Sequence, residues 1–353
     1  MLKYTPHRQP TQSIAMIARY SLQPCNLLFL AAFCAALAAA LPASSAASTA
    51  QPVAATQAFV QTLPDKLRTH VQLSFVSDSR FGFDWVPGTR PGVSLGELND
   101  TQRDALRDVL RSVMSPAGAQ AAEAIVIVEK ALGEIEGNPG FRDPGRYWLT
   151  VFGEPSNGKI WGLRFEGHHL SANFTLNGDK VLSATPSFFG SNPETVPSGP
   201  HKGLRPIAAK ESRAWALYDS LTPEQRERAR SGGGLFGGFK TSSGTRTFDA
   251  GAPDGLPASA MTAPQREKLS ALIDAYVSLA KEDFAARYRS EVVSGEAGTL
   301  YFHWRGAEKQ GEAFFYRIQG RRLMIEHDAH DGALHVHSIW RDKDLDFGGA
   351  AYR

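Results

Sequence analysis

The sequence predicts an α+β protein with two pseudo-equivalent halves, each with helices packed on an antiparallel β-meander. Two observations support this fold class. A set of strand-like segments occurs twice, over residues 147–175 and again over 300–328. A segment with helical spacing of its apolar residues precedes each set. Helices followed by strands that can pair as consecutive hairpins are typical of α+β folds.

The helical segments begin at residues that favour helix N-termini. Residues 95–113 and 262–277 carry apolar side chains three and four positions apart, which indicates amphipathic helices. In the second segment Thr262 is a natural N-cap, and Gln265 stands at the capping-box position. Residues 222–226 (TPEQR) predict a third helix start of the same kind.

The two strand sets align residue by residue, which indicates an internal duplication. Aligning Arg164 with Arg317 also aligns Gly167 with Gly320. Each set continues through a Gly-containing turn into a further strand. The predicted strands are 147–153, 160–166 and 169–175 in the first set, and 300–306, 314–319 and 322–328 in the second.

The segment between the halves, residues 231–258, is rich in Gly, Pro and Ser. We interpret it as a linker or a lid. Its glycines do not form a phosphate-binding loop, because Phe239 precedes Lys240 where such a loop requires glycine. We therefore expect residues 51–230 to form the first half and 259–353 the second.

The N-terminus has the layout of a secretory signal peptide. Residues 27–41 are an uninterrupted apolar run, with Arg19 before it and small residues after it. We expect residues 1–46 to be removed and the protein to be periplasmic or secreted, with no stable membrane anchor after cleavage. A start at Met16 would give the signal a more ordinary length.

The composition of the remaining chain excludes several functions. Both cysteines, Cys25 and Cys34, lie in the predicted signal, so thiol catalysis and cysteine-based metal sites are excluded. Removal of Lys3, Arg8 and Arg19 leaves 35 basic against 36 acidic residues. Binding to nucleic acid or anionic membranes normally needs a basic excess, so neither is expected.

Five of the ten histidines lie in the last 51 residues, where the sequence predicts a β-hairpin. Asp331-Gly332 favours a two-residue type I′ turn between two apolar-rich runs. Counting outward from that turn pairs His330 with Ala333. The side chains predicted to share one face of the hairpin are those of Glu326, Asp328, His335 and His337.

Two imidazoles and two carboxylates on one face are suitable ligands for a divalent metal. We expect Asp328, His335 and His337 to bind the metal, with Glu326 as a fourth ligand or a proton shuttle. Zinc is favoured, while copper and iron accept the same ligand types. The alternative is a solvated polar face on which histidines happen to lie.

His168 and His169 form the second candidate site. Gly167 and His168 form a tight turn, and His169 shares strand parity with Ser171 and Asn173. If the two halves face each other, His169 and Asn173 approach the C-terminal histidines, and His169 can act as a proton shuttle. The alternative is a hydrogen-bonded turn residue. For Arg164 and its counterpart Arg317 we expect structural ion pairs.

Several of these segments resemble the bacterial family catalogued as domain of unknown function 3500, over roughly residues 83–348. The segments that carry the resemblance are 161–175, 185–190, 316–320, 323–328 and 335–342. The family pattern has Tyr where His327 stands, Asn at Ala329 and Pro at Arg321. It matches at Asp328, His335 and His337. The resemblance implies no established activity.

The residues themselves lead us to expect a metal-dependent hydrolase that acts in a cleft between the halves. A metal-binding or metal-delivery protein without turnover would use the same ligands. An envelope interaction protein with no metal is the third interpretation. The sequence does not indicate which bond would be hydrolysed.

Overall fold

The structure is a computed structural model that describes residues 51–230 and 239–352. Residues 49–353 form one compact unit. The predicted signal peptide and residues 231–238 of the predicted linker lie outside the described residues. None of the described helices combines the length and the apolar character needed to cross a membrane.

The fold is α+β, as predicted, and the described residues contain one mixed sheet of 12 strands. Its order is β1-β3-β4-β5-β7-β12-β11-β10-β9-β8, with β2 paired to β3 and β6 paired to β5. Only β1 with β3 is a parallel pair among these strands. The strands are β1 (Gln72–Leu73), β2 (Val93–Ser94), β3 (Tyr147–Phe152), β4 (Ile160–Gly167), β5 (Leu170–Asn177), β6 (Lys180–Ser183), β7 (Ser187–Ser191), β8 (Leu256–Pro257), β9 (Tyr301–Gly306), β10 (Phe314–Gln319), β11 (Leu323–His330) and β12 (His335–Asp342).

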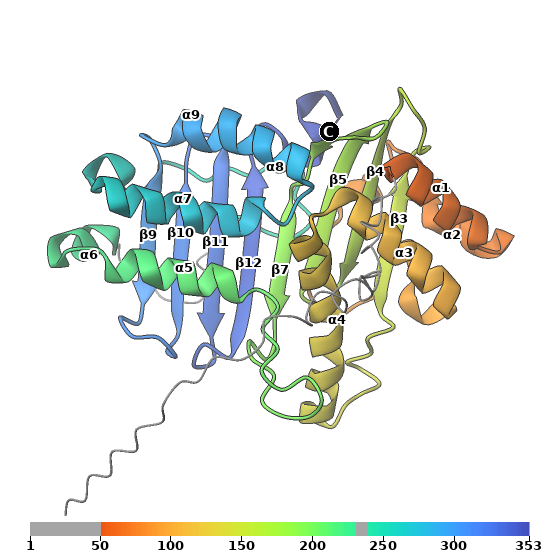
Figure 1. Ribbon diagram of the computed structural model, residues 1–353, viewed down its shortest axis with the longest axis horizontal. Helices are drawn as coiled ribbons and strands as arrows, with labels where there is room; N and C mark the ends of the chain where they lie inside the picture. The colour runs from red at the N-terminus through yellow and green to blue at the C-terminus, as the bar shows by residue number, and fades with distance from the viewer. Residues whose placement is uncertain (1–50, 231–238, 353) are drawn as a thin grey trace, which may run out of the picture. The chain divides into compact units, whose positions relative to one another are not determined.

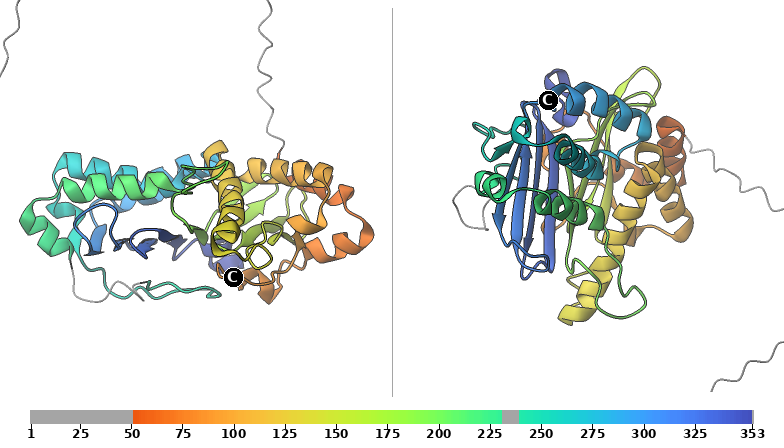
Figure 2. Two further views of the ribbon diagram at one scale, coloured as in Figure 1. Left: turned by 90° about the horizontal axis from the view of Figure 1, so that it is seen from below. Right: turned by 60° about the vertical axis from the view of Figure 1, so that its left-hand side comes forward.

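Helices cover one face of the sheet, and irregular segments cover the other (Figures 1 and 2). A π-helical turn, Arg289–Val293, connects α8 to α9. The helices are α1 (Pro52–Thr62), α2 (Asp65–Val71), α3 (Asp100–Val113), α4 (Pro116–Glu136), α5 (Ala208–Asp219), α6 (Pro223–Ala229), α7 (Ala263–Val277), α8 (Glu282–Tyr288) and α9 (Ser294–Glu296).

The predicted helix starts at residues 222 and 262 are confirmed. Thr222 and Thr262 both form capping boxes with the glutamine three residues later. Helices α5 and α6 precede the predicted boundary at residue 230, yet they lie over strands of the second set: Trp215 of α5 packs edge-on against Trp304 of β9, 4.8 Å between ring centroids.

The two predicted meanders, β3-β4-β5 and β9-β10-β11, pair in the same register. Arg164 lies opposite Asn173 in the first, and Arg317 lies opposite Glu326 in the second. Each residue of the second pair therefore lies 153 positions after its counterpart in the first pair. The same difference relates the β3·β4 pairing to the β9·β10 pairing. The meanders join into one sheet through the antiparallel pairing of β7 with β12.

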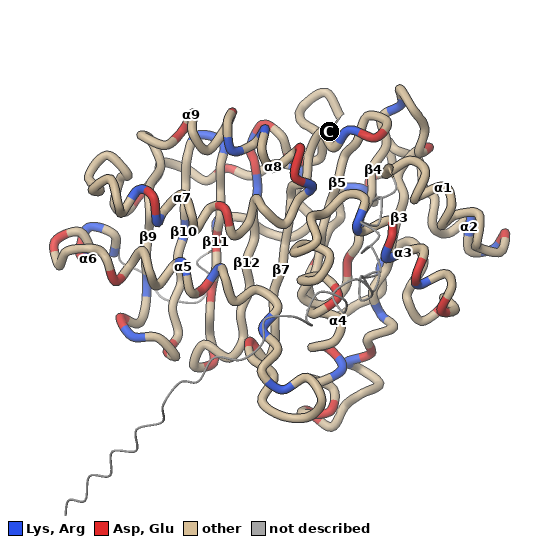
Figure 3. Tube along the Cα trace, viewed as in Figure 1, with Lys and Arg blue, Asp and Glu red and all other residues tan. Residues whose placement is uncertain are grey.

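The face without helices carries charged side chains that are paired with each other. Residues of both signs are interspersed over the elements (Figure 3). Arg164 Nε lies 2.6 Å from Glu166 Oε1, and Arg317 pairs with Asp254. All but Asp254 of these side chains are buried. The predicted structural ion pairs are therefore confirmed.

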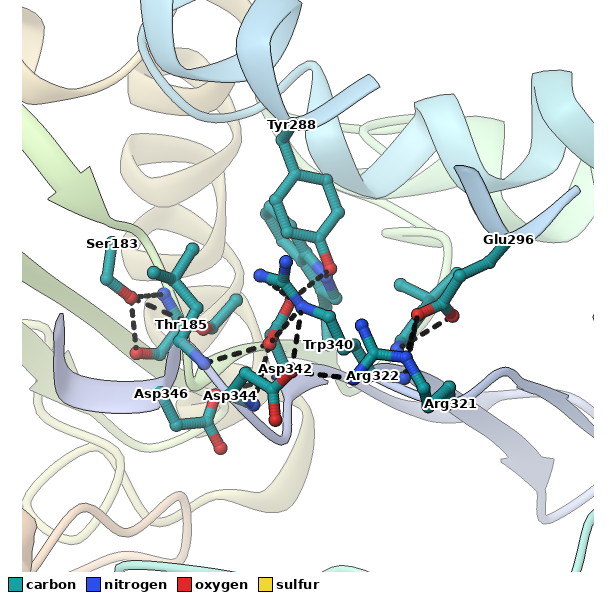
Figure 4. A network of polar contacts seen from close by, with 12 residues as sticks. Ser183, Thr185, Tyr288, Glu296, Arg321, Arg322, Trp340, Asp342, Asp344 and Asp346 are labelled. Atoms are coloured by element: carbon teal, nitrogen blue, oxygen red, sulfur yellow. Dashed lines mark hydrogen bonds and ion pairs between the residues drawn. The ribbon is translucent and has the colours of Figure 1, made fainter. Parts of the chain in front are cut away.

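A polar network holds the end of β12 that is farther from its turn (Figure 4). The Asp342 carboxylate accepts hydrogen bonds from the Tyr288 hydroxyl at 2.9 Å and from Arg322 Nη2 at 3.0 Å. It also accepts the backbone N–H groups of Asp344 and Leu345. These bonds offset the desolvation of a fully buried carboxylate.

Lys210 of α5 is buried against the helix-covered face of the sheet. Its Nζ donates to Ser338 Oγ at 2.7 Å and lies 4.3 Å from the centroid of the Tyr276 ring. Burial lowers the pKa of the Lys210 amine well below its usual value. Burial therefore disfavours the charged form of this amine.

We predict that Lys210→Met raises the free energy of unfolding at pH 7. Unfolded lysine has a pKa of about 10.4, and burial lowers that of Lys210 in the folded chain, so the unfolded chain binds more protons at this position over the range between the two values. The unfolding free energy of the wild type should therefore increase as the pH increases from 7 towards 10. The contribution of Lys210 to this increase should be absent from the variant.

Urea unfolding at several pH values measures the effect of Lys210→Met. The exposed Lys130 of α4 provides the control. Lys130→Met should change the unfolding free energy by no more than about 0.5 kcal/mol at any pH. Identical pH profiles for wild type and Lys210→Met would contradict the prediction.

Candidate metal centre

The β11–β12 hairpin has a longer turn than predicted. His330 pairs with His335 rather than with Ala333, and Asp328 pairs with His337. The predicted two-residue turn is therefore wrong. The pairing of β12 with β7 fixes the register of β12, and residues 331–334 form the connection. Because the shift is two residues, the predicted face is retained.

Three imidazoles from two distant parts of the chain converge beside this hairpin. His169 lies in the turn between β4 and β5, while His335 and His337 lie at the start of β12. The Nε2 atom of His169 lies 2.8 Å from that of His335 and 3.3 Å from that of His337. The expected approach of His169 to the C-terminal histidines is therefore confirmed.

The backbone holds His169 in this position at an energetic cost. Its φ of 61° lies in the left-handed region, which favours glycine. Such a conformation costs on the order of 1 kcal/mol in a residue with a Cβ atom. The backbone N–H of His169 donates to Trp85 O at 2.9 Å, and its carbonyl accepts from Gly190 N at 2.8 Å. Strained backbone conformations of this kind are concentrated at functional sites.

Gly190 of β7 allows His169 to come close to β12. It lies opposite His337 in the β7·β12 pairing. A Cβ atom added to Gly190 would lie 2.8 Å from the Val336 carbonyl oxygen and 3.2 Å from His169 Cδ2. A glycine is therefore required where the three imidazoles meet.

Two of the convergent imidazoles, those of His169 and His335, favour the neutral form. Burial, together with the neighbouring histidines, lowers the pKa of His169 well below its usual value. Burial and the adjacent His337 and His330 lower the pKa of His335 to about 3. Neutral rings can share an N–H···N hydrogen bond, and they can equally donate lone pairs to a metal.

Carboxylates contact the other nitrogen atom of both β12 histidines. Asp328 Oδ1 lies 3.0 Å from His337 Nδ1, and Asp331 Oδ2 lies 3.7 Å from His335 Nδ1. Burial acts to raise the pKa of Asp328, but hydrogen bonds from His330 and His337 outweigh it and hold that pKa below its usual value. An ionised Asp328 directs Nε2 of His337 towards His169.

Three overlapping groups of His and acidic side chains in the described residues can hold a metal ion. The first is His169, His335 and His337. The second contains Asp328, His330 and His337, and the third contains His330, Asp331 and His335. The cluster is reached from solvent, since the side chains of His335 and His337 are 20% and 17% exposed.

Glu326, which was expected to be a ligand or a proton shuttle, lies elsewhere. It pairs with Ile339, and its carboxylate accepts hydrogen bonds from Lys240 N at 2.8 Å and from Thr241 Oγ1 at 2.8 Å. It thereby anchors the segment after residue 238 to β11. Asn173, which was also expected near the cluster, donates instead to Pro186 O.

Several residues around the cluster were not predicted: His330, and Glu129 and Arg142, which contact the neighbouring His168. His330 has the same strand parity as Asp328, so the spacing alone was a usable signal. Glu129 had no such signal, because α4 was not predicted, and neither did Arg142 in the loop after α4. A cavity of about 480 Å³ between α3 and α4, with Leu106, Val126 and Phe165 among its lining residues, contains no residue of the cluster.

Fold and site together define an α+β protein with a solvent-accessible histidine and carboxylate cluster where the two meanders join. A family model described as "Protein of unknown function (DUF3500)" matches residues 45–349. The chain belongs to this family, as its resemblance indicated. Comparisons with curated proteins and with solved structures find no match.

We predict that Gly190→Ala destabilises the protein by about 1–3 kcal/mol, because the added methyl group overlaps the Val336 carbonyl and the His169 ring. Chemical denaturation measures the change. Gly140→Ala provides the control, since a Cβ atom there meets nothing within 4 Å. Equal stability of the two variants would show that the close approach at Gly190 is relieved without cost.

Proposed function

We propose that the protein binds one divalent transition metal, preferably zinc, through the Nε2 atoms of His169, His335 and His337. The observation that carries this proposal is the convergence of these three atoms, with His169 2.8 Å from His335 and 3.3 Å from His337. Nitrogen ligands of a tetrahedral zinc ion lie about 3.3 Å apart, given zinc–nitrogen bonds of about 2.0–2.1 Å. Small side-chain movements would complete such a site.

The contacts around the imidazoles support this choice among the three groups. In metal sites, the nitrogen of a histidine that does not bind the metal commonly contacts a carboxylate. Asp328 and Asp331 stand in this relation to His337 and His335. The proposal therefore gives Asp328 an orienting role and makes His169 a ligand, which differs from the roles expected from the sequence.

The proposed activity is metal-dependent hydrolysis. Three histidine ligands leave an open position, and a metal with such a position can activate water for attack on a substrate. His330 lies beside both β12 ligands, with ring centroids 4.2 Å from His335 and 5.1 Å from His337. It is placed to exchange protons between the site and the exposed Asp331.

A metal-binding or metal-delivery protein is the second candidate. The observation that favours it is the overlap of the three ligand groups, since His330 and Asp331 offer a second set of ligands nearer to solvent. A metal could pass between such sets without any turnover. The two candidates differ in whether a coordination position stays open to small molecules.

We further propose that the two halves arose by duplication and that only one copy acquired the metal site. The constant difference of 153 residues supports this, and it aligns His169 with Arg322. Export is proposed from the apolar run 27–41 and the confinement of both cysteines to the first 34 residues. N-terminal sequencing of secreted protein that begins at Met1 would exclude cleavage.

Purified protein should contain about one zinc ion per chain, measured by elemental analysis after metal loading and desalting. His335→Ala combined with His337→Ala should reduce the content to a small fraction of this, because two of the three nitrogen ligands are lost. His201→Ala, at an exposed turn, is the matched control and should retain the metal. Equal content in the double variant and wild type would remove the proposal.

Azide should change the visible spectrum of the cobalt(II)-loaded protein if a coordination position is open, as hydrolysis requires. The measurement is a titration with azide in which the absorbance of the cobalt(II) ligand-field bands is recorded. A spectrum that stays constant up to high azide concentration would count against hydrolysis and favour the metal-delivery function.

A further inference from the structure

A buried carboxylate and a second histidine support the ring of His169. Glu129 of α4 lies with Oε2 2.5 Å from His168 Nδ1, and both side chains are at least nine-tenths buried. The ring of His168 stacks on the ring of His169, with centroids 3.7 Å apart and planes 28° apart. Glu129 is therefore linked to the candidate ligand His169 by its contact with His168 and by the stacking of the two histidine rings.

Further contacts fix the position of His168. The Tyr147 hydroxyl donates to the His168 carbonyl oxygen at 2.8 Å. Arg142 Nη1 lies 3.4 Å from the His168 ring nitrogens, and its Nε donates to Glu136 Oε2 at 2.8 Å. The imidazole of His168 is thus held by groups from α4, from the loop after α4 and from β3.

The other half of the molecule has an equivalent carboxylate with a different task. The segments before α4 and α8 pair with each other through Met114 and Ala280. Glu129 and Glu296 follow at similar distances along the chain, and the π-helical turn in the second half accommodates one extra residue. Glu296 accepts the backbone N–H of Arg322 at 2.9 Å, which fixes the β10–β11 turn (Figure 4).

Glu296 has a structural role, whereas Glu129 acts on the candidate metal site. In the second half the carboxylate binds turn backbone, so it stabilises the hairpin directly. In the first half the carboxylate binds a side chain, and that side chain covers one face of His169. A buried carboxylate is costly to desolvate, and the bond from Glu129 to His168 offsets this cost. The same bond fixes the orientation of the His168 ring.

We propose that Glu129 and His168 are positioning residues of the metal site, holding the His169 imidazole in the orientation in which its Nε2 meets those of His335 and His337. This inference rests on the proposed function. His169 starts from a strained backbone and, unlike His335 and His337, lies in a two-residue turn. The stacked His168 ring supplies the lateral support that a strand supplies to the other two ligands.

The test compares zinc affinities of full-length variants by competition with a chromophoric chelator, together with the visible spectrum of the cobalt(II) forms. Glu129→Ala should weaken zinc binding about tenfold or more and alter the cobalt spectrum, as is usual when an orienting residue is lost. Glu129→Gln keeps an oxygen acceptor for His168 and should remain within about threefold of wild type.

Glu296→Ala is the matched control, because it removes the equivalent carboxylate from the half without the histidines. It should lower the denaturation midpoint yet leave zinc affinity and the cobalt spectrum unchanged. Should Glu129→Ala not fold, His168→Ala replaces it, since that change removes the stacked ring itself.

The outcomes separate this inference from the proposed function. Wild-type protein that binds no zinc would refute the metal site as a whole. Wild-type binding with unchanged affinity and spectrum in Glu129→Ala would overturn only the positioning role. Equal losses in Glu129→Ala and Glu296→Ala, or a loss in Glu129→Gln as large as in Glu129→Ala, would also overturn it.

Discussion

The antiparallel pairing of β7 with β12 is the interaction on which the rest of the structure depends. It joins the two meanders into one sheet, and it sets the register of β12 against the strand that contacts the β4–β5 turn. His337 lies opposite Gly190, whose N–H holds the carbonyl of His169. The three imidazoles therefore meet because two segments far apart in sequence are hydrogen-bonded neighbours.

The histidine cluster draws on the β4–β5 turn of one meander, whereas the other meander, which pairs in the same register, has different residues at its corresponding turn. His168 and His169 connect β4 to β5, and Arg321 and Arg322 lie in the connection of β10 to β11. Both pairs contact a carboxylate from the helix layer. The two turns can carry different residues because in each case a buried carboxylate from the helix layer pairs with them.

Local patterns predicted much of the fold. The meander strands and the capped starts of α6 and α7 were predicted because alternation and capping depend on neighbouring residues. Helix α4 was missed because its alanines and β-branched residues give little amphipathic contrast. The joining of both meanders into one sheet was also missed, since no local signal encodes the pairing of strands that are distant in sequence.

The face shared by Asp328, His335 and His337 was predictable because strand parity survives a register shift of two residues. Their partners were not. The register of β12 depends on its pairing with β7. The Glu326 carboxylate is taken up by hydrogen bonds from the backbone of residues 240–241, which are distant in sequence. The expectation that His169 comes near came from the repeated pattern. Its closeness to His335 depends on Gly190, whose importance is visible only in three dimensions.

The outermost strands of the sheet have a consequence for association. β1 and β8 are each two residues long, and Pro257 of β8 has no N–H to offer. Exposed strand edges are the usual template for uncontrolled pairing between chains. Outermost strands as short as these offer a second copy little backbone of their own to pair with, which is one way in which proteins limit edge-to-edge association.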